Sequence, residues 1–159
     1  MRWTAFAAVV LFLLSCGPEL DPGPEQDLPD AIKAKSYALH TTDAVGAAWL
    51  TSFPIHTTWD VHLATDLIGA FSGHHTERVV VWMPSGAAYQ ALTVSFATDV
   101  PAAAGEQQAQ RIGSGWRVWT SFPVAGTTIE EFNLAGPWSA GVWVDSATAA
   151  NASVTFTLQ

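Results

Sequence analysis

Tryptophan is the residue type with the clearest binding chemistry in this sequence. The chain contains eight tryptophans, and an indole can stack on a sugar ring or anchor a protein partner, because it combines apolar area with an N–H donor. Where the valine before a tryptophan points into a core, alternation along a strand turns the indole outward. This pattern predicts three outward indoles as candidate ligand- or partner-binding residues: Trp82, Trp119 and Trp143.

Three other tryptophans of the folded part share a strand face with apolar neighbours, which predicts core positions for Trp49, Trp59 and Trp116. Trp138 follows Gly136-Pro137 and is expected to close one end of the sandwich. Two alternatives to an aromatic platform stay open. The segment 98–114 could fold over the outward indoles and bury them, or the alternation could be shifted by one residue, which would invert every assignment.

The five histidines are a second possible source of chemistry. Imidazole suits copper or zinc, and on a strand spanning 57–63 the side chains of Asp60 and His62 share the solvent face. His74 and His75 are expected on the next loop. No spacing of a known metal motif occurs, so these four residues are weak metal candidates against solvated histidines, and we expect no cofactor.

Catalytic patterns are not found. The sequence has no Gly-x-Ser-x-Gly elbow, and on a strand the adjacent Glu130 and Glu131 would point to opposite faces. We expect them on a solvated loop edge of a protein that is not an enzyme.

The charge balance argues against nucleic acid as a partner. Lys and Arg number 6 against 14 Asp and Glu, for a net charge of −8, whereas nucleic-acid binding needs a basic face.

The N-terminal segment predicts export. Arg2 precedes an apolar run from Ala5 to Leu14, which is too short for a membrane-spanning helix of ~20 residues but fits a signal peptide. Its end, Leu13-Leu14-Ser15-Cys16, resembles the lipobox of bacterial lipoproteins. The resemblance implies lipid attachment at Cys16 and loss of residues 1–15. Gly17, in place of Asp, implies the outer rather than the inner membrane. An ordinary secretory signal is the alternative.

Residues 16–30 combine the cysteine with a Pro- and acid-rich stretch that predicts an extended tether. Residues 31–159 are expected to form one all-β domain, since short β-branched and aromatic runs alternate with turn residues. The cleanest alternations are Leu92–Phe96 and Val154–Leu158, and Val79–Met83 is an apolar run ended by Pro84-Ser85-Gly86. No sustained helical period occurs.

The two halves of this domain echo each other, which suggests an internal duplication. Four segments recur in order, with the coincidental likeness of sandwich strands as the alternative: Thr51–Pro54 and Thr120–Pro123; Thr57-Thr58 and Thr127-Thr128; Val81-Trp82 and Val142-Trp143; Val94–Phe96 and Val154–Phe156. The second half also resembles immunoglobulin-like domains of secreted bacterial lipoproteins, on these segments: Phe122–Thr127, Leu134–Trp138, Val142–Asp145 and Phe156. This resemblance implies an antiparallel β-sandwich of about seven to nine strands.

These patterns together predict a lipid-anchored envelope protein with a non-catalytic β-sandwich. Its expected role is structural or protein-interacting within the envelope. The alternatives are glycan binding through Trp82, Trp119 and Trp143, and histidine-based copper or zinc binding.

Overall fold

The computed structural model describes residues 35–159. The predicted signal peptide, Cys16 and the predicted tether of residues 16–30 lie outside these described residues. Within 35–159 no helix is long and apolar enough to cross a membrane.

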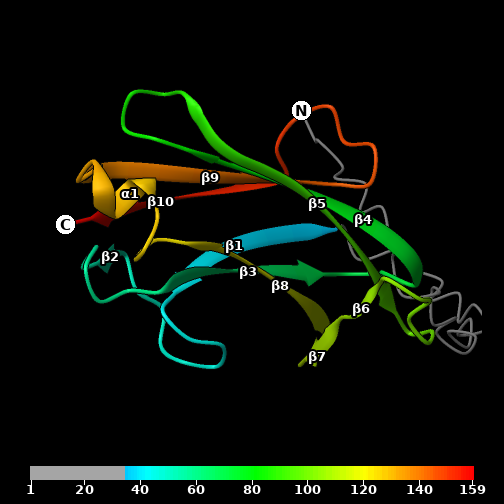
Figure 1. The fold of residues 1–159 in the computed structure, drawn as a ribbon. Helices are drawn as coiled ribbons and strands as arrows, with labels where there is room; N and C mark the ends of the chain where they lie inside the picture. Colours follow the sequence, from blue (N-terminus) through cyan, green and yellow to red (C-terminus); the bar gives the residue numbers. More distant parts are fainter. Residues whose placement is uncertain (1–34) are drawn as a thin grey trace, which may run out of the picture. The chain divides into compact units, whose positions relative to one another are not determined.

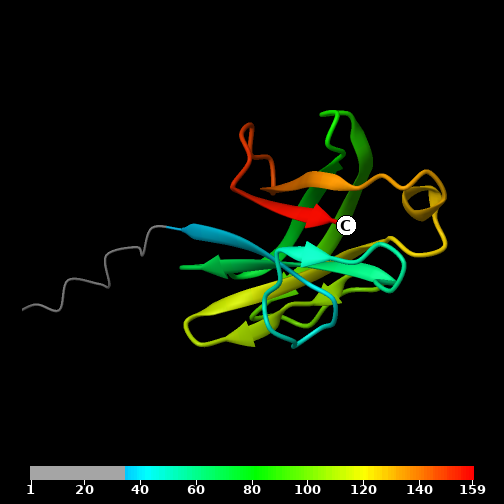
Figure 2. The ribbon, with the colours of Figure 1, turned by 90° about the vertical axis from the view of Figure 1, so that its left-hand side faces the viewer.

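The described residues form two sheets that stack as two layers (Figures 1 and 2). The four-stranded sheet has the order β1 (Ser36–Thr42), β3 (Asp60–Ile68), β8 (Gly115–Pro123), β7 (Gln110–Ile112). The six-stranded sheet has the order β2 (Ser52–Phe53), β10 (Ala152–Leu158), β9 (Gly136–Val144), β4 (Gly73–Trp82), β5 (Ala88–Thr98), β6 (Gln107–Gln108).

This strand order is that of an immunoglobulin-like sandwich. In that fold, strands A, B, E and D form one sheet, while G, F, C and C′ form the other. Strands β1, β3, β8 and β7 occupy the first set of places, and β10, β9, β4 and β5 the second. The predicted fold class is therefore confirmed.

The strand count differs slightly from the prediction of seven to nine. The described part has ten strands, of which β2, β6 and β7 have only two or three residues. Two of these short strands pair in parallel: β2 with β10, and β6 with β5. Every pair formed by two long strands is antiparallel.

The predicted strands form where the alternation placed them. Leu92–Phe96 lies in β5 and Val154–Leu158 in β10, with Phe96 and Phe156 buried. The apolar run at Val79 lies in β4 and ends in the predicted turn, where the N–H of Gly86 donates to the carbonyl of Met83.

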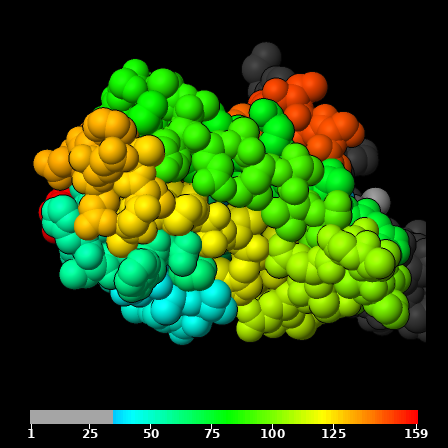
Figure 3. All heavy atoms as spheres, viewed as in Figure 1, coloured from blue at the N-terminus to red at the C-terminus, as the bar shows by residue number. Residues whose placement is uncertain are grey.

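One short helix, α1 (Thr128–Glu131), was not predicted. The Thr127 side chain accepts a hydrogen bond from the N–H of Ile129, and Ile129 is fully buried. A capping hydroxyl and one buried anchor suffice for a single turn, but such a turn is too short to show a helical period. In Figure 3 this segment (orange) meets the β4–β5 hairpin (green) at the surface, where the Tyr89 and Thr128 hydroxyls contact each other.

The core between the sheets is divided into two apolar clusters. On β3, Leu63 belongs to the first cluster and Leu67 belongs to the second. By alternation, the inward residue between them on this strand is Thr65, which is buried. Buried polar side chains also lie among these apolar residues: Thr65 on β3, Thr120 on β8 and Glu77 on β4.

The sequence echo has a partial structural counterpart. Strands β4 and β9 are antiparallel neighbours, and Trp82 pairs with Ser139 just as Trp143 pairs with Arg78. A local two-fold axis therefore exchanges the two tryptophans. The matched segments Thr51–Pro54 and Thr120–Pro123, in contrast, contribute to different sheets, through β2 and β8. Duplication remains a prediction.

Candidate functional site

The three predicted indoles do not form one platform. Trp82 and Trp143 stand on the outer face of the six-stranded sheet, on β4 and β9, whereas Trp119 stands on the outer face of the four-stranded sheet, on β8. All three are half-buried. The structure thus offers two separate aromatic surfaces.

On the six-stranded sheet, Trp82 and Trp143 touch each other. Their ring centroids are 5.9 Å apart, with the planes at 64°. The two rings close over Gly141, where a Cβ atom would lie 3.1–3.2 Å from both indoles. Glycine at this position lets the rings approach the sheet and each other.

Arg78 completes this surface. Its guanidinium lies 4.2 Å from the centroid of the Trp143 ring, and the residue is exposed. Among the described residues, Arg111 and Arg117 lie within 4.0 Å of carboxylates, whereas no carboxylate lies that close to Arg78. We refer to Arg78, Trp82 and Trp143 as the paired-indole surface.

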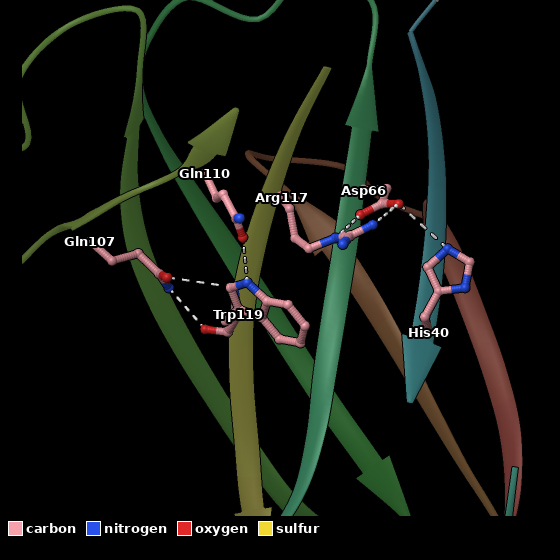
Figure 4. A network of polar contacts seen from close by, with 6 residues as sticks. All are labelled: His40, Asp66, Gln107, Gln110, Arg117 and Trp119. Atoms are coloured by element: carbon pink, nitrogen blue, oxygen red, sulfur yellow. Dashed lines mark hydrogen bonds and ion pairs between the residues drawn. The ribbon is translucent and has the colours of Figure 1, made fainter. Parts of the chain in front are cut away.

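On the four-stranded sheet, the outer face carries a charged network (Figure 4). The Arg117 guanidinium donates to both carboxylate oxygens of Asp66, at 2.6 and 2.8 Å, and His40 Nε2 lies 3.5 Å from the same carboxylate. The hydrogen bond to Asp66 raises the pKa of Arg117 above its usual value. The guanidinium is therefore charged and fixed in orientation.

Trp119 is held from the neighbouring strands. Its indole N–H donates to the Gln110 side chain at 3.1 Å, and the Gln107 amide donates to its backbone carbonyl at 3.0 Å (Figure 4). Gln107 belongs to β6 of the other sheet, so this amide also ties the two sheets together. Part of the segment 98–114 thus contacts Trp119 without burying it completely.

Trp49 joins this network, contrary to its predicted core position. It is 41% exposed, stacks on His40 at 4.6 Å and lies 4.6 Å from the Arg117 guanidinium. Trp49 precedes β2, which begins only at Ser52, so strand alternation does not extend to it. We refer to His40, Trp49, Asp66, Arg117 and Trp119 as the Trp49 cluster.

The core prediction is wrong for Trp59 as well, which is 75% exposed. Strand β3 begins at Asp60, so the alternation that buries Val61 and Leu63 ends before Trp59. The core prediction is confirmed for Trp116, which is 8% exposed, and Trp138 is buried as well, at 1%.

The four weak metal candidates are not brought together. Asp60 and His62 lie at the beginning of β3, whereas His74 and His75 lie at the beginning of β4, next to the end of β3. The adjacent histidines are in a strand and not in the predicted loop. No three acidic, histidine or cysteine side chains in residues 35–159 are grouped so that they could hold a metal ion.

His74 and His75 instead pair with carboxylates at one rim of the sandwich. His74 Nδ1 lies 2.7 Å from Glu106, and His75 Nδ1 lies 3.2 Å from Asp145. These residues line an open hollow of about 410 Å³. Hydrogen bonds from the Ala103 N–H and from His74 lower the pKa of Glu106.

Glu130 and Glu131 lie on α1 and not on a loop edge. Glu130 accepts from the N–H of Gly126 at 2.6 Å and contacts His56 at 2.9 Å, and these bonds lower its pKa. Glu130 therefore fixes the turn before the helix, and Glu131 is exposed.

The most unusual ionisable group, Glu77, was not singled out from the sequence. It is 0% exposed, and neither carboxylate oxygen has a hydrogen-bond partner. Burial raises its pKa to about 7, although the nearby Thr65 hydroxyl lowers it somewhat. The signal was present in the sequence: if Val79 and Val81 point inward, alternation also turns Glu77 inward.

Comparisons with known proteins support no family assignment. No family model matches the chain, and no curated protein matches its sequence. One similar solved structure is the CARDB domain of the PF1109 protein from Pyrococcus furiosus in complex with di-metal ions, with 10% identity, a TM-score of 0.41 and coverage of 79% of this chain and 87% of that chain. Another is β-glucosidase 3B from Thermotoga neapolitana in complex with glucose, with 13% identity and a TM-score of 0.41. The similarity covers 77% of this chain but only 15% of the β-glucosidase chain.

Proposed function

We propose that the chain is a lipid-anchored protein of the cell envelope whose β-sandwich is a non-catalytic interaction module. The Trp49 cluster carries this proposal. It places an exposed indole beside an arginine that is already fixed by a bidentate carboxylate.

Tryptophan and arginine are the residues most enriched at energetic centres of protein interfaces. The Trp49 cluster holds both in place before binding: Arg117 contacts Asp66 and the indoles of Trp49 and Trp119. A surface whose side chains are already ordered loses less conformational entropy on association. The preassembled cluster therefore suits docking of an envelope protein.

Site-specific photo-crosslinking in intact cells tests this role. A photoreactive residue in place of Trp49 is expected to give a discrete adduct with an envelope protein. The matched control is the same residue in place of Trp59, which is more exposed but lies outside the cluster. Absence of an adduct at position 49, or the same adduct at both positions, would contradict docking through the Trp49 cluster.

The membrane anchor has its own test. Replacing Cys16 by Ala removes the only sulfur to which lipid can be attached, and two or three acyl chains provide durable anchoring where one does not. We expect Cys16→Ala to move the protein from the membrane fraction to the soluble fraction of the envelope. Retention of the variant in the membrane would rule out the lipobox interpretation.

Gly17 provides the matched control for the destination of the protein. Gly17→Ala should leave the protein in the outer membrane, whereas Gly17→Asp should retain it in the inner membrane, as the lipoprotein resemblance implies. Sucrose-gradient separation of the two membranes measures the difference. Identical distributions of the two variants would contradict the predicted outer-membrane location.

Glycan binding is a second candidate role, and one observation favours it. The two tryptophans predicted to be equivalent, Trp82 and Trp143, are in contact on one sheet face, so they can present adjoining aromatic surface to a sugar chain. The histidine-based alternative gains no such support, because its four residues are divided between two distant strand positions.

A further inference from the structure

The outer face of the six-stranded sheet has an unusual composition around the paired-indole surface. The inward residues of β4, β5, β9 and β10 belong to the core, so the residues between them face outward. Seven of these outward residues carry hydroxyls: Thr76, Thr93, Ser95, Ser139, Ser153, Thr155 and Thr157.

Arg78 is the one charged residue among the outward positions of Thr76–Trp82, Ala91–Ser95, Ser139–Trp143 and Ser153–Thr155. The next acid along β9, Asp145, already accepts from the N–H of Thr76 and contacts His75. At physiological salt, charges beyond ~8 Å are screened. Arg78 therefore supplies the one positive charge at the centre of this face, although the chain carries a net charge of −8.

The Arg78 guanidinium is available to an anion, because the residue is exposed and no carboxylate of residues 35–159 lies within 4.0 Å of it. A guanidinium can donate two N–H groups to one carboxylate in a bidentate manner. Arg78 lies over the Trp143 ring, and Trp82 contacts Trp143. The indoles, on which a sugar ring can stack, therefore lie next to a guanidinium that is free to bind an anion.

We infer that the paired-indole surface binds an acidic glycan, with a sugar ring on the indoles and its carboxylate or sulfate on Arg78. This inference rests on the glycan-binding candidate and adds to it the charge of the ligand. The surrounding hydroxyls complement a polyhydroxylated chain, since each can donate and accept a hydrogen bond.

A pair of ligands that differ only in charge tests the inference. The full chain, purified in detergent, is titrated with oligogalacturonate and with the fully methyl-esterified oligomer, while tryptophan fluorescence and calorimetry record binding. We expect the acid to bind at least tenfold more tightly than the ester, and this preference to shrink as salt is raised.

Single-residue variants test whether the ligands bind at the paired-indole surface. Arg78→Gln should weaken binding of the acid at least tenfold and remove the preference over the ester, whereas Trp82→Ala should weaken both ligands. The matched control is Arg111→Gln, because Arg111 is also exposed and its guanidinium lies over an indole, 4.7 Å from the centroid of the Trp116 ring. This control should bind both ligands within twofold of the unchanged protein.

The possible failures can be told apart. Equal binding of acid and ester, both lost in Trp82→Ala, would leave glycan binding standing and overturn the acidic preference. Absence of binding to either oligomer would overturn both. Equal effects of Arg78→Gln and Arg111→Gln would show that acid binds through overall charge and not at this site. Oligoglutamate binding as tightly as oligogalacturonate, unaffected by Trp82→Ala, would show a site for acidic peptides.

Discussion

Replacing Glu77 by Gln is expected to stabilise the fold at pH 8 by about 3 kcal/mol and to change little at pH 5. The pKa of Glu77 is raised from 4.5 to about 7 by burial. One pKa unit corresponds to about 1.4 kcal/mol, which gives the size of the effect. Urea unfolding followed by far-UV circular dichroism at both pH values measures it.

The sign follows from proton linkage. Between pH 4.5 and about 7 the folded chain holds a proton on Glu77 that the unfolded chain releases, so stability falls as the pH rises through this window. Above pH 7 the buried carboxylate is ionised without a partner, which is its least favourable state. Glutamine keeps the size of the side chain and has no proton to lose.

The surroundings of Glu77 offer no compensating charge. The nearby Thr65 hydroxyl lowers the pKa of Glu77 somewhat, but it carries no charge. His75 lies on the same face of β4 as Glu77 but is paired with Asp145. The pKa of Tyr37 is also raised, and burial is the main cause. No ion pair in residues 35–159 includes Glu77.

Glu131→Gln is the matched control, because it removes one exposed carboxylate without opening the core. Its stability should stay within about 0.5 kcal/mol of the unchanged protein at both pH values. A loss of stability in Glu77→Gln at pH 8, or an equal change at pH 5 and pH 8, would show that the carboxylate has a partner or reaches solvent.

Strand alternation was sufficient to predict an all-β domain and its buried positions because it acts locally, whereas the immunoglobulin-like sandwich was predicted from a resemblance. Phe96, Phe156 and Val79 are buried where the pattern places them, and each lies inside a strand. The pattern fails where a strand ends, as at Trp59, because the orientation of a residue outside the ladder depends on tertiary contacts. The sequence contains no local signal for the residue at which β3 begins.

The candidate sites show the same limit. Alternation correctly turned Trp82, Trp119 and Trp143 away from the core, but it could not show which strands would be neighbours. Only the pairing of β4 with β9 brings Trp82 to Trp143 and Arg78. Likewise, the contact of Trp49 with His40 depends on the path of a connection between strands, which no periodicity describes.

A comparison of two tryptophans tests the structure against the sequence predictions. Strand alternation placed Trp59 in the core, and Trp138 was expected to close one end of the sandwich. Trp138 is 1% exposed, stacks on Phe122 at 6.2 Å, meets Tyr89 edge-on at 5.4 Å and donates its N–H to the carbonyl of Leu134. Trp138→Ala should therefore lower the free energy of unfolding by ~3–5 kcal/mol, because it opens a cavity and leaves that carbonyl without its donor.

Trp59→Ala should instead change the free energy of unfolding by less than about 0.5 kcal/mol, since the Trp59 side chain is 75% exposed. Both substitutions remove the same atoms, so the difference between them reports only the surroundings of the two indoles. Urea unfolding at pH 5, where Glu77 is protonated, keeps the carboxylate from obscuring the result. Equal losses would mean that Trp59 packs in the core and that β3 begins before Asp60. A small loss at Trp138 would mean that the end of the sandwich near Leu134 is open, because the carbonyl and the rings around the indole would then be able to turn to water.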